Sequence, residues 1–496
     1  MATIKPVRVR FAPSPTGRVH LGSARTALYD FLIAQKTGGQ FILRIEDTDR
    51  KRYVEGAEEE LINGLKWLGI QWDEGPDIGG PYGPYRQSER KEIYLEHAKK
   101  LIDSGKAYYC FCSPSRLAEV REQQQKNKEN PHYDGYCREL PLEEAKKRVA
   151  EGESHVIRFK TPREGATIVT DLLRGEISID NRQLDDSILV KSDGWALYHL
   201  AAMVDDHLMK ITHVIRGSEW LPTFPLHSML YRAFGWEEPI WVHLSVFLKP
   251  SGKGKMSKRE AAELNLSGHS IFLKDMADLG YLPAGINNWI ALMGWSLDDH
   301  TEFFTMKNLI KDFDLARLNP SPAAINFSKL DHFNGLHIRN LQVDDLAERL
   351  LPYFQQAGID ADLATIKKIT PIIQERMVTL DDCVEKAGFF FQSKVTYDPK
   401  ELIAKGLTAE QSLEILSACI GILEGLISLS PTMAEEPLRT YVETSGYKPG
   451  QVFGVLRVAT TGQAVSPPLF ETMEIIGREV VFQRLQDARE LLKQML

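Results

Sequence analysis

Near the N-terminus the apolar positions change from an alternating to a helical period, which predicts a strand followed by a helix. From Val7 to Phe11 apolar and basic residues alternate, as in a half-buried strand. A turn with Pro13, Pro15 and Gly17 follows. A helix is then expected from about His20, with a buried face of Leu21, Ala24, Leu28, Phe31 and Leu32 and an end at Gly38-Gly39.

The next segments continue this alternation of strands and helices. A second strand is predicted over Phe41–Ile45, and helices are predicted over residues 55–69 and about 88–104. Between these helices lies a loop rich in glycine and proline, from Gly75 to Pro84. The order strand–helix–strand–helix favours an α/β fold built on a parallel sheet.

After residue 106 the pattern changes to short strand-like runs, which indicate an inserted α+β domain. The runs are Ala107–Phe111, Val156–Lys160, Ile177–Ile179 and Ile188–Val190. Sheet-type sequence returns at Ile211–Arg216 and is followed by a helix over Leu226–Phe234. From about residue 270 onward the pattern is almost wholly helical.

Composition places the chain among multidomain globular proteins. Its 496 residues predict three to five domains, and 43% hydrophobic with 26% charged residues is ordinary for such proteins. No apolar run reaches the roughly 18 residues of a membrane span, and the first residues resemble neither a signal nor a transit peptide. A cytoplasmic protein without membrane or DNA partners is therefore expected.

The net charge of −8 is mild evidence against a nucleic-acid-binding protein. A phosphate-binding surface can still be a local basic patch on an acidic whole. The C-terminal third contains slightly more acidic than basic residues, so the linear sequence reveals no such patch.

Three segments are candidates for chemistry. In Pro13–Ser23, a strand meets a helix N-terminus, which suits a phosphate; Gly22 permits close approach and His20 can donate to a phosphate oxygen. The loop Lys253–Arg259 can close over a triphosphate and neutralise its charge. Arg44–Asp47 ends the second strand, where Glu46 can pair with an ammonium group. The alternatives are an ordinary helix start, a solvated basic loop and a helix-capping acidic cluster.

In this order, the first two segments resemble the signatures of class I aminoacyl-tRNA synthetases, known as HIGH and KMSKS. They read His20-Leu21-Gly22-Ser23 and Lys255-Met256-Ser257-Lys258-Arg259. Other segments resemble the glutamyl branch of this class: Arg10 to Gly17, Arg44 to Arg50, Tyr198-His199-Leu200, Asp205-Asp206-His207 and Val214-Ile215-Arg216. The resemblance covers essentially the whole chain and is strongest over residues 6–260.

The resemblance implies a Rossmann-like class I catalytic domain with an α+β insertion and an α-helical C-terminal anticodon-binding module. The expected boundaries are 1–105 and 200–250 for the two catalytic halves, 106–199 for an acceptor-stem-binding insertion, 251–332 for a stem-contact region with the KMSKR loop, and 333–496 for the anticodon-binding module.

The implied reaction is the ATP-dependent activation of L-glutamate, with Mg²⁺ accompanying ATP, and transfer of the glutamyl group to the 3′ end of tRNA(Glu). The implied catalytic residues are His20, Lys255 and Lys258. Gly22 and Trp220 join these three in binding ATP, and glutamate is held by Arg10, Ala12, Ser14, Glu46, Tyr198 and Arg216. Ala202 stands where relatives often have Asn, so one hydrogen bond to the substrate is missing or made by water.

Five cysteines, an odd number, argue against a disulfide framework. Cys383 and Cys419 lie in helical patterns and are expected to be buried as small apolar side chains. The other three, Cys110, Cys112 and Cys137, have the spacing of a tetrahedral metal site and resemble the zinc site of some relatives.

The fourth zinc ligand is left open by the sequence. Tyr133 matches the tyrosine of some relatives, whereas others use a histidine where this chain has Glu139. Three reduced, metal-free thiols remain the alternative. A second acidic group, Asp205-Asp206-His207, is expected to be hydrogen-bonded and structural, because the resemblance places it under the active site.

The anticodon is expected to contact Arg376 and, as a second residue, Arg457. Arg376 matches the position where relatives that discriminate against tRNA(Gln) carry arginine, so a discriminating enzyme is predicted; a plain surface cation is the alternative.

Rival functions are a glutaminyl enzyme, a shorter paralogue that glutamylates a tRNA base, a small-molecule nucleotidyltransferase, and a catalytically inactive tRNA-binding paralogue. Retention of His20, Glu46, Lys255 and Lys258 argues against the last.

Overall fold

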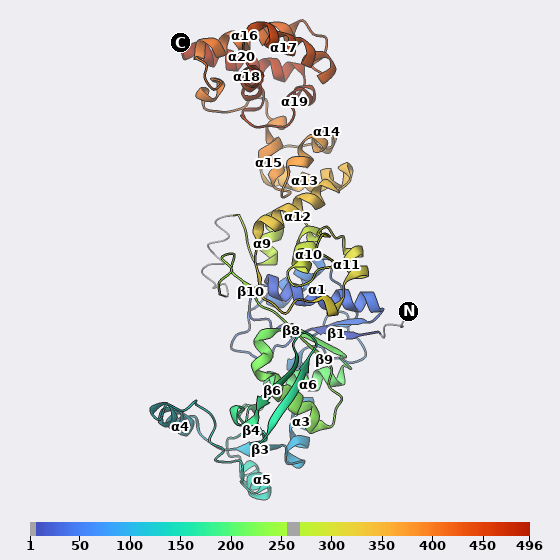
Figure 1. The fold of residues 1–496 in the computed structure, drawn as a ribbon, viewed down its shortest axis with the longest axis vertical. Coiled ribbons are helices and arrows are strands. Elements are labelled where there is room, and N and C mark those ends of the chain that lie inside the picture. The colour runs from blue at the N-terminus through green and yellow to red at the C-terminus, as the bar shows by residue number, and fades with distance from the viewer. Residues whose placement is uncertain (1–5, 255–267) are drawn as a thin grey trace. The chain divides into compact units, whose positions relative to one another are not determined.

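The computed structural model describes residues 6–254 and 268–496. The chain divides into two compact units (Figure 1). Unit 1 comprises residues 1–276 and 286–327, and unit 2 comprises residues 277–285 and 328–496. In the part of the chain that the structure describes, no helix is long and apolar enough to cross a membrane.

Unit 1 begins with the predicted strand–helix–strand. Strand β1 (Arg8–Phe11) pairs in parallel with β2 (Gln40–Leu43), and α1 (Leu21–Thr37) connects them. Gly38 ends α1 in a left-handed conformation with φ 64°, and a Cβ on Gly39 would lie 2.1 Å from the carbonyl oxygen of Val7. The glycine pair therefore lets the chain leave the helix and pass closely beside β1.

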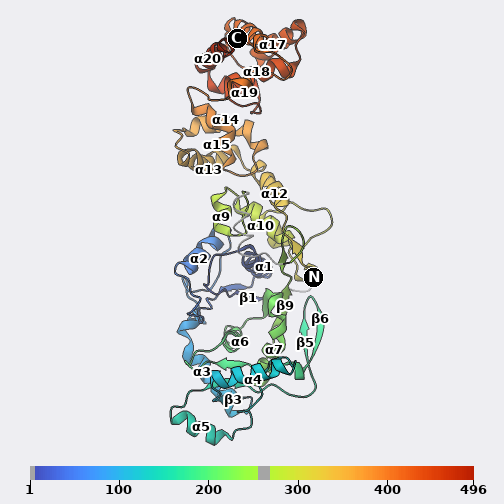
Figure 2. The ribbon, with the colours of Figure 1, turned by 90° about the vertical axis from the view of Figure 1, so that its left-hand side faces the viewer.

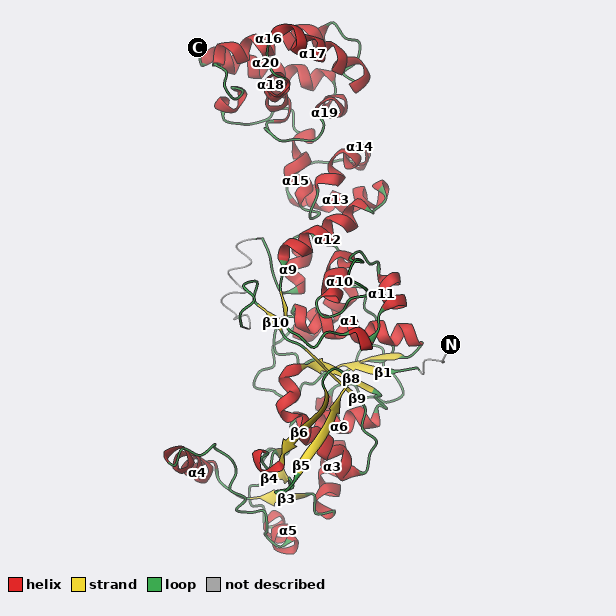
Figure 3. Ribbon diagram, in the orientation of Figure 1, coloured by secondary structure: helices red, strands yellow, loops and turns green. Residues whose placement is uncertain are grey.

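A four-stranded sheet follows β1 and β2 in unit 1, with the strand order β6-β5-β9-β8 (Figure 3). Its members are β5 (Ala166–Asp171), β6 (Gly175–Asp180), β8 (His213–Gly217) and β9 (Ile240–Leu244). Thr212 N donates to Arg8 O at 2.9 Å, so the start of β8 lies beside β1. Strands β5 and β6 thus extend a sheet that also contains β8 and β9, although they fall within the predicted insertion.

Helices cover this region and build its core. They are α2 (Ala57–Trp67), α3 (Lys91–Asp103), α6 (Tyr198–Leu208) and α7 (Phe224–Phe234). Apolar residues of α3, α6 and α7 share one core cluster with Trp241 of β9. The core holds α6 and α7 near β8 and β9; α6 carries the candidate residue Tyr198 and β8 carries Arg216.

A three-stranded antiparallel sheet forms another part of unit 1 (Figure 2). It consists of β3 (Ala107–Cys110), β4 (Val156–Phe159) and β7 (Ile188–Val190), accompanied by α4 (Pro114–Lys126) and α5 (Leu142–Ala150). The remaining elements of unit 1 include β10 (Phe247–Leu248), β11 (Ala323–Ala324) and α11 (Met306–Asp312), with α9 (Leu273–Asp278) and α10 (Pro283–Leu292) at the borders of the two units.

The described residues of unit 2 form helices, as the sequence predicts. They are α12 (Phe327–Arg339), α13 (Val343–Gln356), α14 (Leu363–Ile373), α15 (Asp382–Ala387), α16 (Ala409–Glu424), α17 (Pro431–Ser445), α18 (Pro449–Thr461), α19 (Leu469–Ile476) and α20 (Arg478–Gln494). Cys383 and Cys419 lie in two separate core clusters, and both are buried as predicted.

Candidate active site

The residues predicted to bind ATP phosphates begin where the chain enters α1. His20 is exposed and has an extended backbone, and its Nδ1 accepts a hydrogen bond from Gly22 N at 3.0 Å. Leu21 N donates to Ile271 O at 2.9 Å. Two N–H groups that the sequence offers to a phosphate therefore have protein partners, and a phosphate would have to displace the His20 ring from Gly22. The dipole of α1 still favours an anion at this end.

The segment after β1 contains two of the residues predicted to hold glutamate. Ala12 is half-buried and Ser14 is exposed. Glu46 N donates to Pro13 O at 2.9 Å, which places this segment beside the chain that leaves β2. Both strands end here at their carboxyl ends, where ligands bind in sheets of this kind.

Arg10, Arg44 and Glu46 meet in a buried charge network. Asp206 Oδ1 accepts from Arg10 Nε at 3.0 Å and from an Arg44 terminal nitrogen at 2.7 Å, and Arg44 also donates to Glu46 Oε1 at 3.0 Å. Burial opposes ionisation of Asp206, yet Arg10 and Arg44 hold its pKa below the usual value. Burial raises the pKa of Glu46 to about 7 against the opposing effect of Arg44.

Asp205 lies under this network and ties three elements together. It accepts from Arg90 Nε at 2.7 Å, from Tyr94 OH at 2.8 Å and from Gln87 Nε2 at 3.0 Å. His207, which follows Asp206, stacks on Trp236 with 3.9 Å between the ring centroids. The hydrogen bonds predicted for Asp205 and Asp206 are present, whereas sequence reasoning did not foresee the bond from Arg10 to Asp206.

Arg216 is buried near the C-terminal end of β8 and has neutral hydrogen-bond partners. It donates to His243 Nε2 at 3.0 Å, to His227 Nδ1 at 2.9 Å and to Tyr198 OH at 3.4 Å. Among the described residues no carboxylate lies within 4.0 Å of its guanidinium nitrogens. Burial lowers the pKa of Arg216. A buried guanidinium without a counter-ion is costly, and it is well suited to receive the carboxylate of a ligand.

Trp220 and Tyr198 form one wall of this region. Their rings stack with centroids 4.0 Å apart, and the Trp220 ring centroid lies 5.9 Å from the Arg216 guanidinium carbon. Trp220 belongs to the 3₁₀ helix Ser218–Thr223, which follows β8 directly. Ala202 is fully buried in α6. The predicted residues Lys255 and Lys258 lie outside the described residues.

The three clustered cysteines form a group with the geometry of a metal centre. The Sγ atoms of Cys110, Cys112 and Cys137 all lie within 4.8 Å of one another, and no other such group occurs among the described residues. Cys112 Sγ and Cys137 Sγ are 3.6 Å apart. Thiolates on one tetrahedral zinc, each at about 2.3 Å, lie about 3.8 Å apart, so these residues fit Zn²⁺.

Tyr133 completes the group, whereas Glu139 points elsewhere. The Tyr133 hydroxyl lies 3.3 Å from Cys110 Sγ and 3.7 Å from Cys112 Sγ. The side chain of Glu139 is 80% exposed and pairs with Lys160 at 3.3 Å. The geometry therefore supports Tyr133 as the fourth ligand. A hydrogen bond from Cys137 lowers the pKa of the Cys110 thiol, which favours the thiolate that a metal needs.

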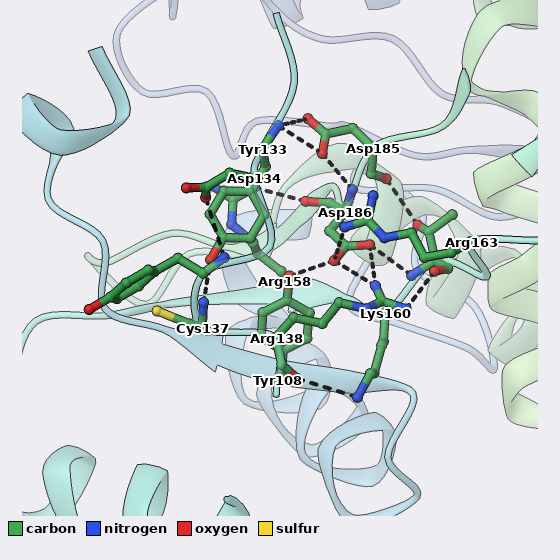
Figure 4. A network of polar contacts seen from close by, with 12 residues as sticks. Tyr108, Tyr133, Asp134, Cys137, Arg138, Arg158, Lys160, Arg163, Asp185 and Asp186 are labelled. Atoms are coloured by element: carbon green, nitrogen blue, oxygen red, sulfur yellow. Dashed lines mark hydrogen bonds and ion pairs between the residues drawn. The ribbon is translucent and has the colours of Figure 1, made fainter. Parts of the chain in front are cut away.

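Two aspartates hold the Tyr133–Cys137 segment in place (Figure 4). Tyr133 N donates to Asp185 Oδ2 at 3.1 Å. Arg138, directly after Cys137, donates to both carboxylate oxygens of Asp186 at 2.6 Å, and Tyr108 OH donates to Asp186 Oδ2 at 2.6 Å. The segment is thus anchored to β3 and to the chain before β7, which keeps Tyr133 beside the cysteines.

The two arginines predicted to read the anticodon converge in unit 2. Arg376 and Arg457 both donate to the carbonyl oxygen of Ser466, Arg457 at 3.1 Å. Arg457 also donates to Pro467 O at 2.7 Å. Burial, reinforced by the charge of Arg376, lowers the pKa of Arg457. Two arginines that are far apart in the sequence thus converge on one carbonyl oxygen.

Comparison with known proteins identifies the family. Residues 6–332 match the family model described as tRNA synthetases class I (E and Q), catalytic domain, and residues 345–489 match an anticodon binding domain. A glutamate–tRNA ligase from Dehalococcoides mccartyi is 46% identical over 480 residues, which are 95% of this chain and 96% of that protein. The chain belongs to the class I glutamate–tRNA ligases.

Other members of the family agree over the full length. The glutamate–tRNA ligase from Chloroflexus aurantiacus is 45% identical over 97% of both chains. A crystal structure of the glutamate–tRNA ligase from Elizabethkingia meningosepticum, in complex with its amino acid, has a TM-score of 0.89 and 36% identity, and covers 98% of this chain and 99% of that one. The predicted fold class, a class I catalytic domain with a helical anticodon-binding module, is confirmed.

Membership of the glutamate–tRNA ligases confirms the predicted enzyme class and the use of ATP. The assignments of single residues, the five domain boundaries and the metal remain predictions. Sequence reasoning had no signal for His227 and His243, because neither lies in a recognisable motif. Their partner Arg216 was identified by resemblance, but the strand that carries His243 shows no alternation that would reveal it.

Purified protein is expected to contain about one Zn²⁺ per chain, because the three thiols and the Tyr133 hydroxyl provide a tetrahedral donor set. Elemental analysis without prior chelation measures the stoichiometry, and X-ray absorption measures the ligands. Tyr133→Phe should change the coordination, whereas the matched control Glu139→Gln should not. Absence of zinc from the wild type would favour free thiols, and unchanged coordination in Tyr133→Phe would exclude Tyr133.

Proposed function

We propose that this chain activates L-glutamate with ATP and transfers the glutamyl group to the 3′ end of tRNA(Glu). The observation that carries the proposal is Arg216, a buried guanidinium whose partners among the described residues are neutral. Two of its five N–H groups, one on each terminal nitrogen, remain for a ligand. They match the two oxygens of a carboxylate in a bidentate pair.

The charges around Arg216 fit the rest of glutamate. Glu46 uses Oε1 for Arg44, which leaves Oε2 for the ammonium group. A bound ammonium would hold Glu46 ionised in spite of the burial that raises its pKa. Arg10 supports the binding of carboxylate, and Asp206 fixes the direction of its guanidinium. In this proposal the same pocket is lined by Ala12 and Ser14, which follow β1, and by Tyr198, the first residue of α6.

The first chemical step joins glutamate to AMP. An α-carboxylate oxygen attacks the α-phosphorus of ATP, a new oxygen–phosphorus bond forms, and the bond to the β-phosphate breaks to release pyrophosphate. The protein contributes positioning and charge stabilisation. His20 and Gly22 at the start of α1 face the phosphates in this proposal, with Lys255 and Lys258 from the loop that lies outside the described residues. Mg²⁺ bound to ATP would neutralise part of the phosphate charge.

The second step transfers the glutamyl group. A ribose hydroxyl at the 3′ end of the tRNA attacks the carbonyl carbon of the adenylate, and AMP leaves with the bonding electrons. Trp220, stacked on Tyr198 near Arg216, supports an adenine-binding role at the edge of the same pocket. Zn²⁺ on the cysteine group would be structural, stabilising the Tyr133–Cys137 segment.

Selection of the tRNA is proposed to depend on Arg376 and Arg457. The third anticodon base is C in tRNA(Glu) and G in tRNA(Gln). Arginine is a pure donor, which suits the O2 and N3 acceptors of cytosine, whereas the N1–H and N2–H donors of guanine would face it unpaired. The convergence of both arginines on Ser466 O supports a single basic site for this base.

Arg376→Ala is expected to reduce the preference for tRNA(Glu) over tRNA(Gln) by roughly 5- to 150-fold, since an arginine–base contact is worth about 1–3 kcal/mol of discrimination. The measurement is kcat/KM for glutamylation of both unmodified tRNAs. The control is Arg349→Ala, which removes an exposed arginine of α13 that pairs with Asp345. If Arg376→Ala keeps the full preference for tRNA(Glu) over tRNA(Gln), Arg376 is only a surface cation.

A further inference from the structure

The guanidinium of Arg216 is oriented from two sides by imidazole rings. His243 lies directly across from Arg216 on the parallel strand β9, and its Nε2 accepts from Arg216 Nε at 3.0 Å. His227 lies on α7, and its Nδ1 accepts from a terminal nitrogen of Arg216 at 2.9 Å. His227 and His243 are both fully buried. One cation therefore lies between a histidine of a helix and a histidine of a strand. We call this pair, His227 and His243, the clamp.

The hydrogen-bond directions in this clamp follow from arginine chemistry. Arginine has five N–H donors and no acceptor, so the two imidazole nitrogens that face Arg216 must lack a proton. His243 then carries its proton on Nδ1 and donates to Asp171 Oδ2 at 2.8 Å. His227 carries its proton on Nε2 and donates to His199 Nδ1 at 2.9 Å. Asp171 and His199 thus fix the tautomers of the two clamp residues.

Both clamp residues are held in the neutral form. Burial lowers the pKa of His227, and the charge of Arg216 lowers it further. Burial also lowers the pKa of His243, although its hydrogen bond to Asp171 opposes the shift. A protonated ring would in addition point an N–H at the guanidinium. The cation is therefore oriented at two of its three nitrogens without being neutralised.

The other two arginines of the site, Arg10 and Arg44, have carboxylate partners. Arg10 and Arg44 share the carboxylate of Asp206, and Arg44 also pairs with Glu46. Their charges are compensated within the protein. Among the described residues of this site, Arg216 alone combines full burial, fixed direction and an unpaired charge. At Arg216 two neutral imidazoles take the place that a carboxylate has at Arg10 and Arg44, and its charge therefore has no counter-ion in the part of the chain that the structure describes.

We propose that His227 and His243 are positioning residues that set the specificity for glutamate, because they aim Arg216 with neutral acceptors and leave its charge for the side-chain carboxylate of the amino acid. This inference rests on the proposed function, in which Arg216 binds that carboxylate. Glutamine offers a neutral amide in the same place and leaves the guanidinium uncompensated, which a buried site rejects. A carboxylate in place of either imidazole would satisfy Arg216 internally and remove the discrimination.

The test uses two substitutions that have the same shape and differ in charge. In His227→Asn and in His227→Asp, a side-chain oxygen takes the place of Nδ1 and accepts from Arg216, but only aspartate brings a negative charge. We expect His227→Asn to keep the KM for glutamate within about five-fold of the wild type. We expect His227→Asp to raise that KM at least about 30-fold while the KM for ATP stays constant, the size expected for a buried charge pair.

The same comparison is made at His243 with the variants His243→Gln and His243→Glu, since the side-chain oxygens of these variants take the place of Nε2. His300, an exposed histidine, provides the matched control pair His300→Asn and His300→Asp, which changes the charge outside the site. Aminoacylation with the full-length enzyme gives KM and kcat for glutamate and ATP, and glutamine is assayed as competing substrate. The ratio of glutamate to glutamine use should fall in both carboxylate variants and remain high in both amide variants.

The outcomes separate this inference from the function on which it rests. If Arg216→Gln leaves the KM for glutamate unchanged, the role of Arg216 and the inference both fail. If Arg216→Gln abolishes glutamate use while amide and carboxylate variants behave alike at both histidines, only the inference is overturned. Should one carboxylate variant not fold, the pair at the other histidine decides, because each pair tests the charge independently.

Discussion

Alanine in place of His20 or Lys258 is expected to lower kcat by about 10²–10³-fold, the usual loss for one donor to developing charge. The KM for glutamate should change much less. In the proposed mechanism both side chains act on charge that grows at the phosphate in the transition state, so their loss should affect turnover rather than ground-state binding. His20 stands at the start of α1, exposed and able to leave its capping bond to Gly22.

Single-turnover measurement of pyrophosphate release with saturating ATP, glutamate and tRNA isolates this step. Two controls match the lost side chains: His300→Ala removes an exposed histidine, and Lys99→Ala removes an exposed lysine of α3. Both should turn over like the wild type. Unchanged turnover in His20→Ala or in Lys258→Ala would remove that residue from the catalytic role.

Glutamine in place of Arg216 is expected to lower kcat/KM for glutamate by roughly 30- to 5,000-fold. Loss of one member of a buried, hydrogen-bonded charge pair costs about 2–5 kcal/mol, and the substrate carboxylate would then be buried without its partner. The KM for ATP should stay near the wild-type value, because the guanidinium contacts the amino acid and not the nucleotide in this account. The clamp residues would also lose the donor that they orient.

Steady-state aminoacylation over a wide range of glutamate concentrations measures this effect. The control Arg182→Gln removes an exposed arginine, which pairs with Asp180 in the same unit. Glutamate kinetics near wild type in Arg216→Gln would show that the substrate carboxylate binds elsewhere. A fall in the melting temperature without a change in KM would instead mark Arg216 as structural.

The fold was predictable where a single element carries its own periodicity. The five apolar residues of α1 that recur at helical spacing are all buried, and the helix ends at glycine, so its sequence reveals both its course and its end, although residues 27–34 are buried on every side. Helix α4 was missed because Gln124 is its only buried residue, which leaves no apolar period to detect. Strand β9 was missed because four of its five residues are buried on both faces and show no alternation.

The candidate site was predictable only where its residues lie in contiguous motifs. His20, Glu46 and Arg216 belong to segments that resemble the family, whereas His227 and His243 depend on the packing of α7 and β9 against β8. The cysteines were found from their spacing, but the choice between Tyr133 and Glu139 needs the fold. The linear sequence does not reveal that Arg376 and Arg457 meet at Ser466, because tertiary packing of the helical unit brings them together.

Aminoacylation of purified, unmodified tRNA(Glu) and tRNA(Gln) with radiolabelled glutamate tests the central claim most directly. The account predicts ATP-dependent charging of tRNA(Glu) with glutamate, and charging of tRNA(Gln) that is roughly 5- to 150-fold weaker in kcat/KM, as the arginine–base contact implies. Failure to charge tRNA(Glu) with glutamate, or equally efficient charging of both tRNAs, would contradict it.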